Sequence, residues 1–113
     1  MFKLVDIPEI DTTVEFNVPG QKEPATVTAR WRLLSRDEQE KFQKRVRDGE
    51  VTDEQMLQEM LVNVSGISDG NGNEMADSAQ LRAALLQTTY VAQPLIMSFW
   101  TAQQGRERHV AKN

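Results

Sequence analysis

The most polar stretch of the chain places three oxygen-bearing side chains at the spacing of a calcium-binding loop. Asp69, Asn71 and Asn73 match the first three ligand positions of an EF-hand. That loop also needs glycine at its sixth position and a bidentate glutamate at its twelfth, where this chain has Glu74 and Gln80. Because both requirements fail, and because the Asp-Gly and Asn-Gly pairs here are typical of turns, the sequence predicts a polar turn and no metal site.

Other groups that could perform catalysis are sparse. His109 is the only histidine and there is no cysteine, so the chain offers no histidine-based triad, thiolate zinc site or cysteine nucleophile. Neither the G-x-x-x-x-G-K-[ST] phosphate loop nor the G-x-G-x-x-G motif is present. The acidic residues include no pair in a context that predicts a shifted pKa. We therefore expect a non-enzyme with no catalytic residues, cofactor or metal ion.

Charge is unevenly distributed along the chain. The net charge is −4, whereas residues 105–113 carry Arg106, Arg108 and Lys112 against Glu107, which gives this segment +2 and leaves −6 for the remainder. An acidic body lacks the basic surface that neutralises phosphates, which argues against nucleic acid as a partner. We expect residues 1–104 to form a single domain and residues 105–113 a flexible basic tail.

Nothing in the sequence predicts membrane insertion or secretion. There is no apolar run of about 18 residues. The first ten residues, MFKLVDIPEI, have neither the long apolar core nor the small-residue cleavage site of a secretory signal. The lack of cysteine also suits a reducing compartment. These features favour the cytoplasm and no membrane partner.

Three segments near the N-terminus predict extended structure. Phe2–Val5 is a short apolar run followed by a proline, which predicts an edge strand or an N-terminal arm. Thr12–Val18 and Thr26–Leu33 alternate between apolar and polar residues, as half-buried strands do. Prolines and a glycine between them indicate a loop of about five to seven residues. The two strands should therefore form a β-hairpin whose inner face carries Phe16 and Trp31.

Helical signals dominate the rest of the chain. Ser35 and Thr52 each begin an S/T-x-x-E/Q capping box, and Asp77 or Ser78 is a further N-cap. With apolar residues at helical spacing, these caps predict helices at about 35–47, 52–64, 77–87 and from 90 onward. Gly66 is placed to end the second helix as a left-handed C-cap. The predicted fold class is α+β, with an N-terminal β-hairpin, a small antiparallel sheet, followed by about four α-helices.

The last predicted helix, from Tyr90 to Gln104, has an unusually wide apolar face. Val91, Leu95, Phe99 and Ala102 form one line, and Ala92, Ile96 and Trp100 form a second line beside it. Together they exceed the stripe of roughly 100° that a surface helix needs. The helix is therefore either a central core helix or one that also contacts a partner. Aromatic residues are enriched at binding hot spots, so the candidate partner-binding residues are Ile96, Phe99 and Trp100.

The order of these elements resembles a known family. The hairpin leads into W-R-L-L-S-R-D-E and a charged helix, followed by a turn, an amphipathic helix ending near Gly66, a G-x-G turn, and a capped helix with Leu85-Leu86. An aromatic helix and a basic R-x-R-x-x-x-K-N terminus complete it. The segments Trp31–Glu38, Val62–Gly72 and Ser78–Asn113 look like those of bacteriophage tail assembly chaperones. One departure is Val64, where members similar to this chain often have tryptophan.

The resemblance implies a specific role. Such chaperones of long-tailed phages and prophages coat the tape-measure protein in the bacterial cytoplasm, help to recruit tail-tube subunits and leave before the tail is complete. They are often made in two lengths by ribosomal frameshifting, so the resemblance also implies self-association or association with a frameshift-extended form. Lys112-Asn113 can be encoded by AAA-AAY, which is compatible with a slippery site.

Two other functions compete with this one. A structural phage head-tail connector or tail-completion protein would remain in the virion. A small DNA-binding regulator would need a basic recognition helix, which the acidic body of this chain disfavours.

Overall fold

The first two strands form the predicted hairpin. In the computed structural model, which describes residues 1–105, β1 (Glu9–Phe16) pairs antiparallel with β2 (Ala25–Arg32). Alternate side chains, including Val14, Val27 and Trp31, are buried on one face of the sheet, as the alternation predicted. β1 begins three residues earlier than predicted and ends two residues earlier, because its pairing with β2 runs from Glu9 to Phe16.

Two capping boxes begin the next two helices, as predicted. The Ser35 hydroxyl accepts a hydrogen bond from the backbone N–H of Glu38, and the Glu38 carboxylate accepts one from the N–H of Ser35, at the start of α1 (Arg36–Arg47). Thr52 and Gln55 form the same pair of side-chain to backbone hydrogen bonds at the start of α2 (Asp53–Met60). Each box satisfies backbone donors that have no partner within the helix.

The prediction that the second helix continues to Val64 is wrong. α2 ends at Met60, and the chain goes on as β3 (Leu61–Ser65), which pairs antiparallel with β2. The sheet order is therefore β1-β2-β3. Gly66 does have the predicted left-handed conformation, with φ +84°, but it follows a strand and does not cap a helix.

A bulge explains why this strand resembles a helix in sequence. Leu61 lies opposite Trp31, whereas Asn63 lies opposite the residue before Trp31, so Val62 is an extra residue in β3. Leu61 and Val64 are consequently both buried although they are three positions apart. That spacing is the one by which an amphipathic helix is recognised.

Two helices, separated by a single residue, follow in the chain. α3 (Ala79–Gln87) is capped by Ser78, whose hydroxyl accepts from the N–H of Leu81 at 3.0 Å. α4 (Thr89–Gln103) follows after Thr88. Of the two predicted caps for α3, the structure has Ser78. The fold is α+β, with a hairpin followed by helices, as predicted, and with a third strand added to the sheet.

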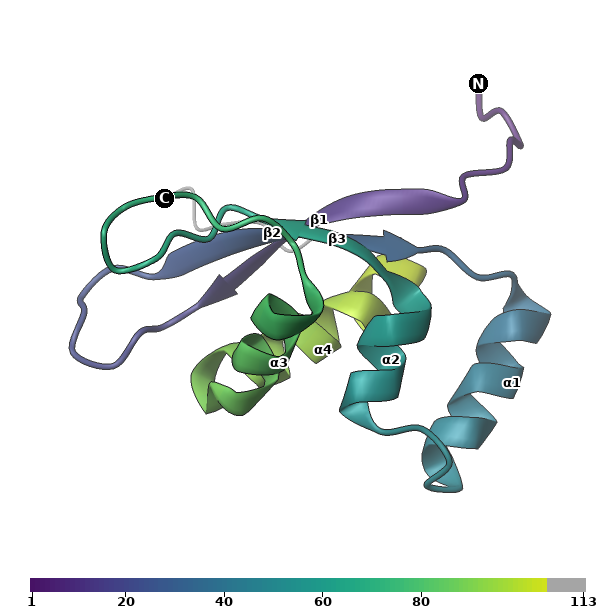
Figure 1. Cartoon of the computed structure of the whole chain (residues 1–113). Coiled ribbons are helices and arrows are strands. Elements are labelled where there is room, and N and C mark those ends of the chain that lie inside the picture. The colour runs from purple at the N-terminus through teal and green to yellow at the C-terminus, as the bar shows by residue number, and fades with distance from the viewer. Residues whose placement is uncertain (106–113) are drawn as a thin grey trace.

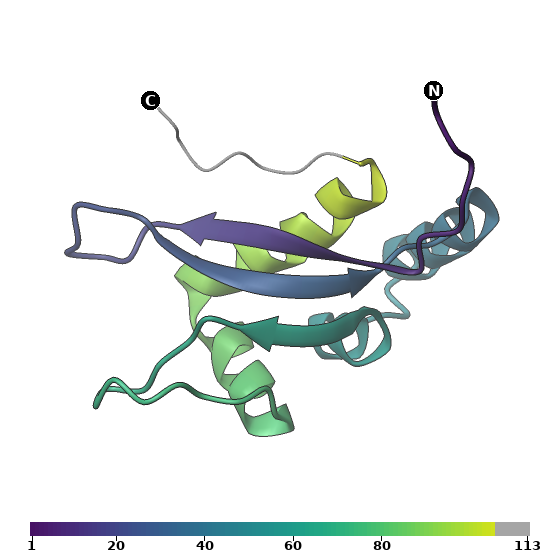
Figure 2. The same ribbon diagram turned by 90° about the horizontal axis from the view of Figure 1, so that it is seen from above.

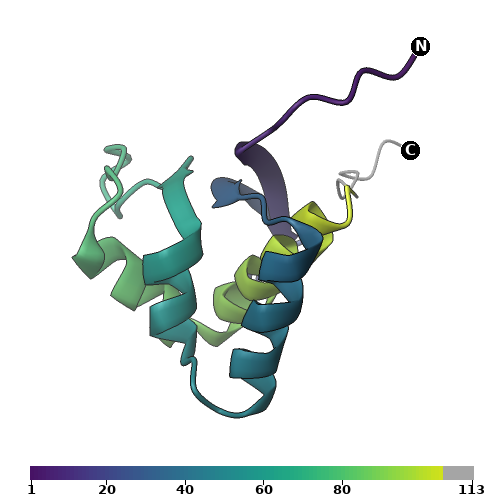
Figure 3. The ribbon, with the colours of Figure 1, turned by 90° about the vertical axis from the view of Figure 1, so that its right-hand side faces the viewer.

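The elements form two layers. Figure 3 shows the sheet on one side and all the helices on the other. α4 crosses beneath β1 and β2 and packs against α3, which in turn contacts α2. Seen from above, the opposite face of the sheet is not covered by any element of residues 1–105 (Figure 2). The core between the layers consists mainly of Val14, Val27, Ala29, Trp31, Phe42, Leu57, Leu61, Val64, Leu81, Val91, Leu95 and Phe99.

Residues 1–8 form an exposed arm. Of the two predicted alternatives for Phe2–Val5, an edge strand or an arm, the structure has the arm, because no strand is assigned before Glu9. It leaves the sheet at the start of β1 and extends away from the domain (Figure 1). Its last residue remains attached, since the N–H of Leu33 donates to the carbonyl of Pro8 at 2.8 Å.

Candidate interaction surfaces

α4 presents apolar residues on three sides. Its line of Val91, Leu95, Phe99 and Ala102 is buried in the core. The second predicted line, with Ile96 and Trp100, is half-buried. A third line, Tyr90, Pro94, Met97 and Thr101, runs toward the outer edge of β1. A helix that is apolar all round needs neighbours in several directions, and only part of the second and third sides is covered within residues 1–105.

Phe99 lies at the centre of an aromatic cluster and is fully buried. Its ring centroid lies 5.3 Å from that of Trp31, 5.6 Å from that of Phe42 and 4.9 Å from that of Trp100, each in an edge-to-face arrangement. These are favourable geometries for aromatic pairs. Phe99 therefore has no accessible surface for a partner and belongs to the core. The accessible candidates are Ile96 and Trp100.

Trp100 forms one wall of a shallow hollow against α1. Gln43, Val46 and Arg47 of α1 complete the hollow, which has a volume of about 300 Å³. On its inner side the Trp100 ring contacts Phe99 and lies 5.8 Å from Phe42. A large ring held from beneath by other rings is presented in one orientation, so it loses little freedom when a partner covers it.

The stretch that was compared with a calcium loop is a turn, as predicted. Ser68 bridges to Glu74, and the Asp69 carboxylate accepts from the N–H groups of Asn71 at 2.8 Å and Asn73 at 3.0 Å. These backbone bonds lower the pKa of Asp69. Among residues 1–105, no three histidine, cysteine or acidic side chains cluster closely enough to hold a metal ion. His109 lies outside the described residues, as does the tail from Arg106 on.

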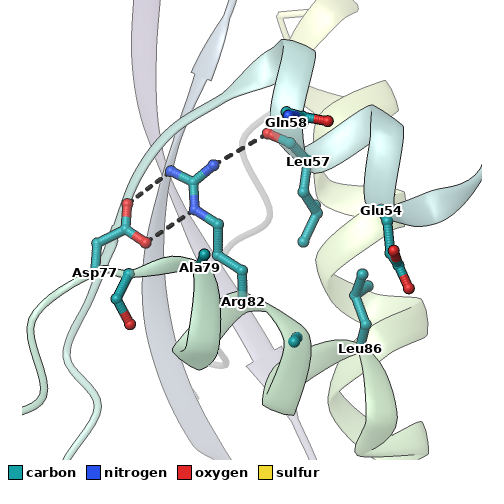
Figure 4. Close-up of a pocket in the computed structure, with 9 residues that line it drawn as sticks. Glu54, Leu57, Gln58, Asp77, Ala79, Arg82 and Leu86 are labelled. Carbon is teal, nitrogen blue, oxygen red and sulfur yellow. Dashed lines mark hydrogen bonds and ion pairs between the residues drawn. The ribbon is translucent and has the colours of Figure 1, made fainter.

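A pocket of about 440 Å³ opens between α2 and α3 (Figure 4). Leu57 and Leu86 point into it, and the Glu54 carboxylate lies at its rim. Arg82 donates to both carboxylate oxygens of Asp77, at 2.9 and 2.6 Å, and to the carbonyl of Leu57 at 3.2 Å. The guanidinium is thus bonded on all three of its nitrogens and joins α2 to the start of α3. The pocket therefore offers apolar contact area, and the Asp77–Arg82 ion pair at its side stabilises the packing of α3 against α2.

This ion pair should make stability depend on pH. The bonds from Arg82 lower the pKa of Asp77 in the folded protein. The resulting stabilisation is complete above the ordinary pKa of about 3.9 and is lost as the pH falls through the lower folded-state pKa. We expect Asp77→Asn to reduce the free energy of unfolding by about 2 kcal/mol at pH 7 and to flatten its decline in acid. Urea unfolding across acidic pH measures both effects.

Glu23→Gln is the matched control for that experiment. Glu23 is an exposed carboxylate in the loop between β1 and β2, so its replacement should leave the free energy of unfolding unchanged at each pH. If Asp77→Asn retains the full acid dependence of the wild type, the Asp77–Arg82 pair is not its source.

A groove of about 330 Å³ runs between β1 and the third side of α4. β1 contributes its consecutive residues 12–15, and α4 contributes Pro94, Met97, Ser98 and Thr101. Met97 is the most exposed side chain of this wall, at 60%. The groove therefore combines the outer edge of a strand with an apolar helix face.

The spacing of residues in the sequence of α4 contains a signal for this groove. Tyr90, Pro94, Met97 and Thr101 repeat at intervals of three or four residues, which places them on one side of a helix. The wide apolar face predicted for this helix consists of two other lines and does not include these residues. Its exposure depends on where β1 lies, which periodicity within the helix does not reveal.

The chain was also compared with known proteins. Compared with family models, with curated proteins and with solved structures, it matched none. Within residues 1–105, no helix is both long enough and apolar enough to cross a membrane. The surfaces described above are therefore the observations on which a function has to be argued.

Proposed function

We propose that this protein is a phage tail assembly chaperone. In this role it binds and solubilises the tape-measure protein in the cytoplasm of the bacterial host, helps to recruit tail-tube subunits during tail morphogenesis, and is not retained in the virion. The role is that of a protein-binding module and needs no catalytic residue. It is supported by the order of elements in the sequence, which resembles that family, and by the apolar surface left accessible on α4.

The observation that carries the proposal is the half-buried Trp100 above a fully buried ring cluster. A chaperone for a long, apolar, helical chain needs surface that binds side chains without collapsing onto itself. Trp100 meets this need because Phe99 and Phe42 fix its ring from beneath. Ile96, one turn earlier on α4, extends the same apolar line. A helix of the tape-measure protein would lay its own apolar stripe along these two residues.

Co-expression with the tape-measure protein tests this contact. We expect Trp100→Ala to weaken binding by roughly tenfold or more, because a rigid aromatic anchor is lost. The amount of tape-measure protein in the soluble fraction should fall accordingly. The variant should stay folded, as judged by circular dichroism, because part of this ring faces solvent.

Leu86→Ala is the matched control for Trp100→Ala. Leu86 is also a half-buried apolar residue, but it lines the pocket between α2 and α3. Its replacement should cost stability without lowering the solubility of the tape-measure protein. If Trp100→Ala unfolds the domain, or if both variants solubilise the tape-measure protein equally well, the assignment of Trp100 as the contact fails.

A structural head-tail connector or tail-completion protein is the alternative function. Mass spectrometry of purified phage particles separates the two. A chaperone that leaves before the tail is complete should be absent from particles or present in traces. Stoichiometric copies in the virion would reject the chaperone role and favour the structural one.

A further inference from the structure

The outer edge of β1 is an unoccupied site for another strand. β1 lies at one end of the sheet order, so among residues 1–105 no strand pairs with its outer side. The bond from Leu33 to the carbonyl of Pro8 shows which residues of this strand face β2. In an antiparallel pair these positions alternate, so Ile10, Thr12 and Val14 also direct their backbone groups to β2. The N–H and C=O groups of Asp11 and Thr13 therefore point outward.

The exposed arm has the composition of a strand that would fit there. Phe2 and Leu4 are 84% and 90% exposed, and they would lie on the same face of an extended chain. Asp6 would share that face, whereas Lys3, Val5 and Ile7 would lie on the other face. Val5 and Ile7 are 63% and 54% exposed. Exposed apolar side chains on a segment with unpaired backbone groups favour addition to a sheet edge.

The two faces of such a strand would meet two different surfaces at the edge. The face toward the helices would place Phe2 and Leu4 in the groove beside Met97, which is 60% exposed. The other face would place Lys3 beside Glu9 and Asp11 of β1. Both carboxylates form ion pairs with Arg30, at 2.8 and 3.1 Å, and the Asp11 side chain is still 60% exposed. A shift of one residue would exchange the two faces and turn Lys3, Val5 and Ile7 toward the groove.

The arm cannot easily reach the edge of its own molecule. The carbonyl of Pro8 is bonded to Leu33, which holds Pro8 in line with β1. Ile7 precedes a proline and is therefore biased toward an extended conformation. The arm accordingly leaves the sheet at the start of β1 and extends away from the domain (Figures 1 and 2). A second copy of the chain can receive it without a reversal of the backbone.

We propose that two copies of this protein exchange their N-terminal arms, each adding residues 2–7 as an antiparallel strand to β1 of the other. Six residues span about 20 Å of the strand. Two such contacts, each burying on the order of 800 Å² over both surfaces, reach the roughly 1,600 Å² of a stable interface. The contact joins copies of this chain and does not depend on the tape-measure protein being its partner.

Sedimentation velocity of the full chain at several concentrations tests the proposal. The wild type should dimerise, and the double variant Phe2→Ser with Leu4→Ser should raise the dimer Kd by about a hundredfold or more. Val62→Ser is the matched control, because Val62 is a partly exposed apolar residue on the opposite edge strand. It should leave the dimer Kd unchanged.

Two variants test the receiving surface. Met97→Glu puts a charge in the groove, and Thr13→Pro removes an outward N–H while sparing the ladder to β2, since the backbone of Thr13 faces away from it. Both should raise the dimer Kd. Met97 is exposed, so Met97→Glu decides the matter if Thr13→Pro proves unstable. Mixing Met97→Glu with the Phe2/Leu4 variant should restore a weaker heterodimer, because one intact arm then meets one intact groove.

Several results would overturn the proposal. One is a wild type that remains monomeric throughout. Another is a dimer that survives the Phe2/Leu4 double variant. A dimer that is unaffected by Met97→Glu would place the arm on some other surface, and a mixture that stays monomeric would show that arm and groove do not meet.

Discussion

Replacing Phe99 with alanine should reduce the free energy of unfolding by about 3–5 kcal/mol. The side chain is fully buried and its ring contacts those of Trp31, Phe42 and Trp100. The change therefore removes apolar burial and three ring pairs and leaves a cavity that rigid neighbours fill poorly. Domains of this kind are stable by only about 5–15 kcal/mol in total. Guanidinium unfolding followed by tryptophan fluorescence measures the loss.

Phe99→Leu and Trp100→Ala are the controls for this result. Phe99→Leu keeps an apolar side chain in the cavity and should cost about half as much or less. Trp100→Ala removes a larger ring, but this ring is only half-buried, so it should cost less than Phe99→Ala. If Trp100→Ala is the more destabilising of the two, then Trp100 belongs to the core and Phe99 does not dominate it.

Trp31→Ala should be destabilising to a similar extent, by about 3–5 kcal/mol. Trp31 is fully buried on β2, and its indole N–H donates to the Ser98 hydroxyl on α4 at 2.9 Å. Ser98 in turn donates to the carbonyl of Leu95 at 2.6 Å. The residue thus ties the sheet to α4 through a hydrogen bond and through its ring contact with Phe99. Thermal and denaturant unfolding should both show the loss.

Trp31→Phe separates the ring from the hydrogen bond. It keeps an aromatic ring beside Phe99 but removes the donor to Ser98, so it should cost less than Trp31→Ala, with about 1 kcal/mol of the cost due to the bond. Trp31→Ala and Phe99→Ala should not be additive when combined, because the two rings are in contact. A Trp31→Ala variant that is as stable as the wild type would contradict the packing described.

The replacements of Phe99 and Trp100 also bear on the proposed function. Replacing Phe99 should mainly lower the free energy of unfolding, because its ring is enclosed. Replacing Trp100 should mainly weaken binding of the tape-measure protein, because its ring is partly open to solvent. Separating the two effects experimentally would show whether the ring cluster supports a binding surface. A loss of binding in Phe99→Ala alone would be explained by unfolding.

Local signals in the sequence determined much of this fold. The hairpin was predicted because Val27, Ala29 and Trp31 alternate with polar residues, and alternation is a property of the strand itself. The starts of α1 and α2 were predicted because a capping box lies within four consecutive residues, beginning at Ser35 and Thr52. The polar turn at Asp69 was predicted because Asp-Gly and Asn-Gly pairs are typical of turns. Each of these features depends on interactions between near neighbours in the chain.

Tertiary structure alone decided three other features. The sequence of β3 predicts a helix because Leu61 and Val64 have a helical spacing. The bulge at Val62 allows both to be buried in a strand, and only pairing with β2 makes the segment a strand. Phe99 and Trp100 are adjacent aromatic residues, and their different burial follows from where Trp31 and α1 lie. The groove beside β1 likewise forms between elements distant in sequence. The physical reason is common to all three, because long-range contacts determine which of several locally acceptable conformations and faces is buried.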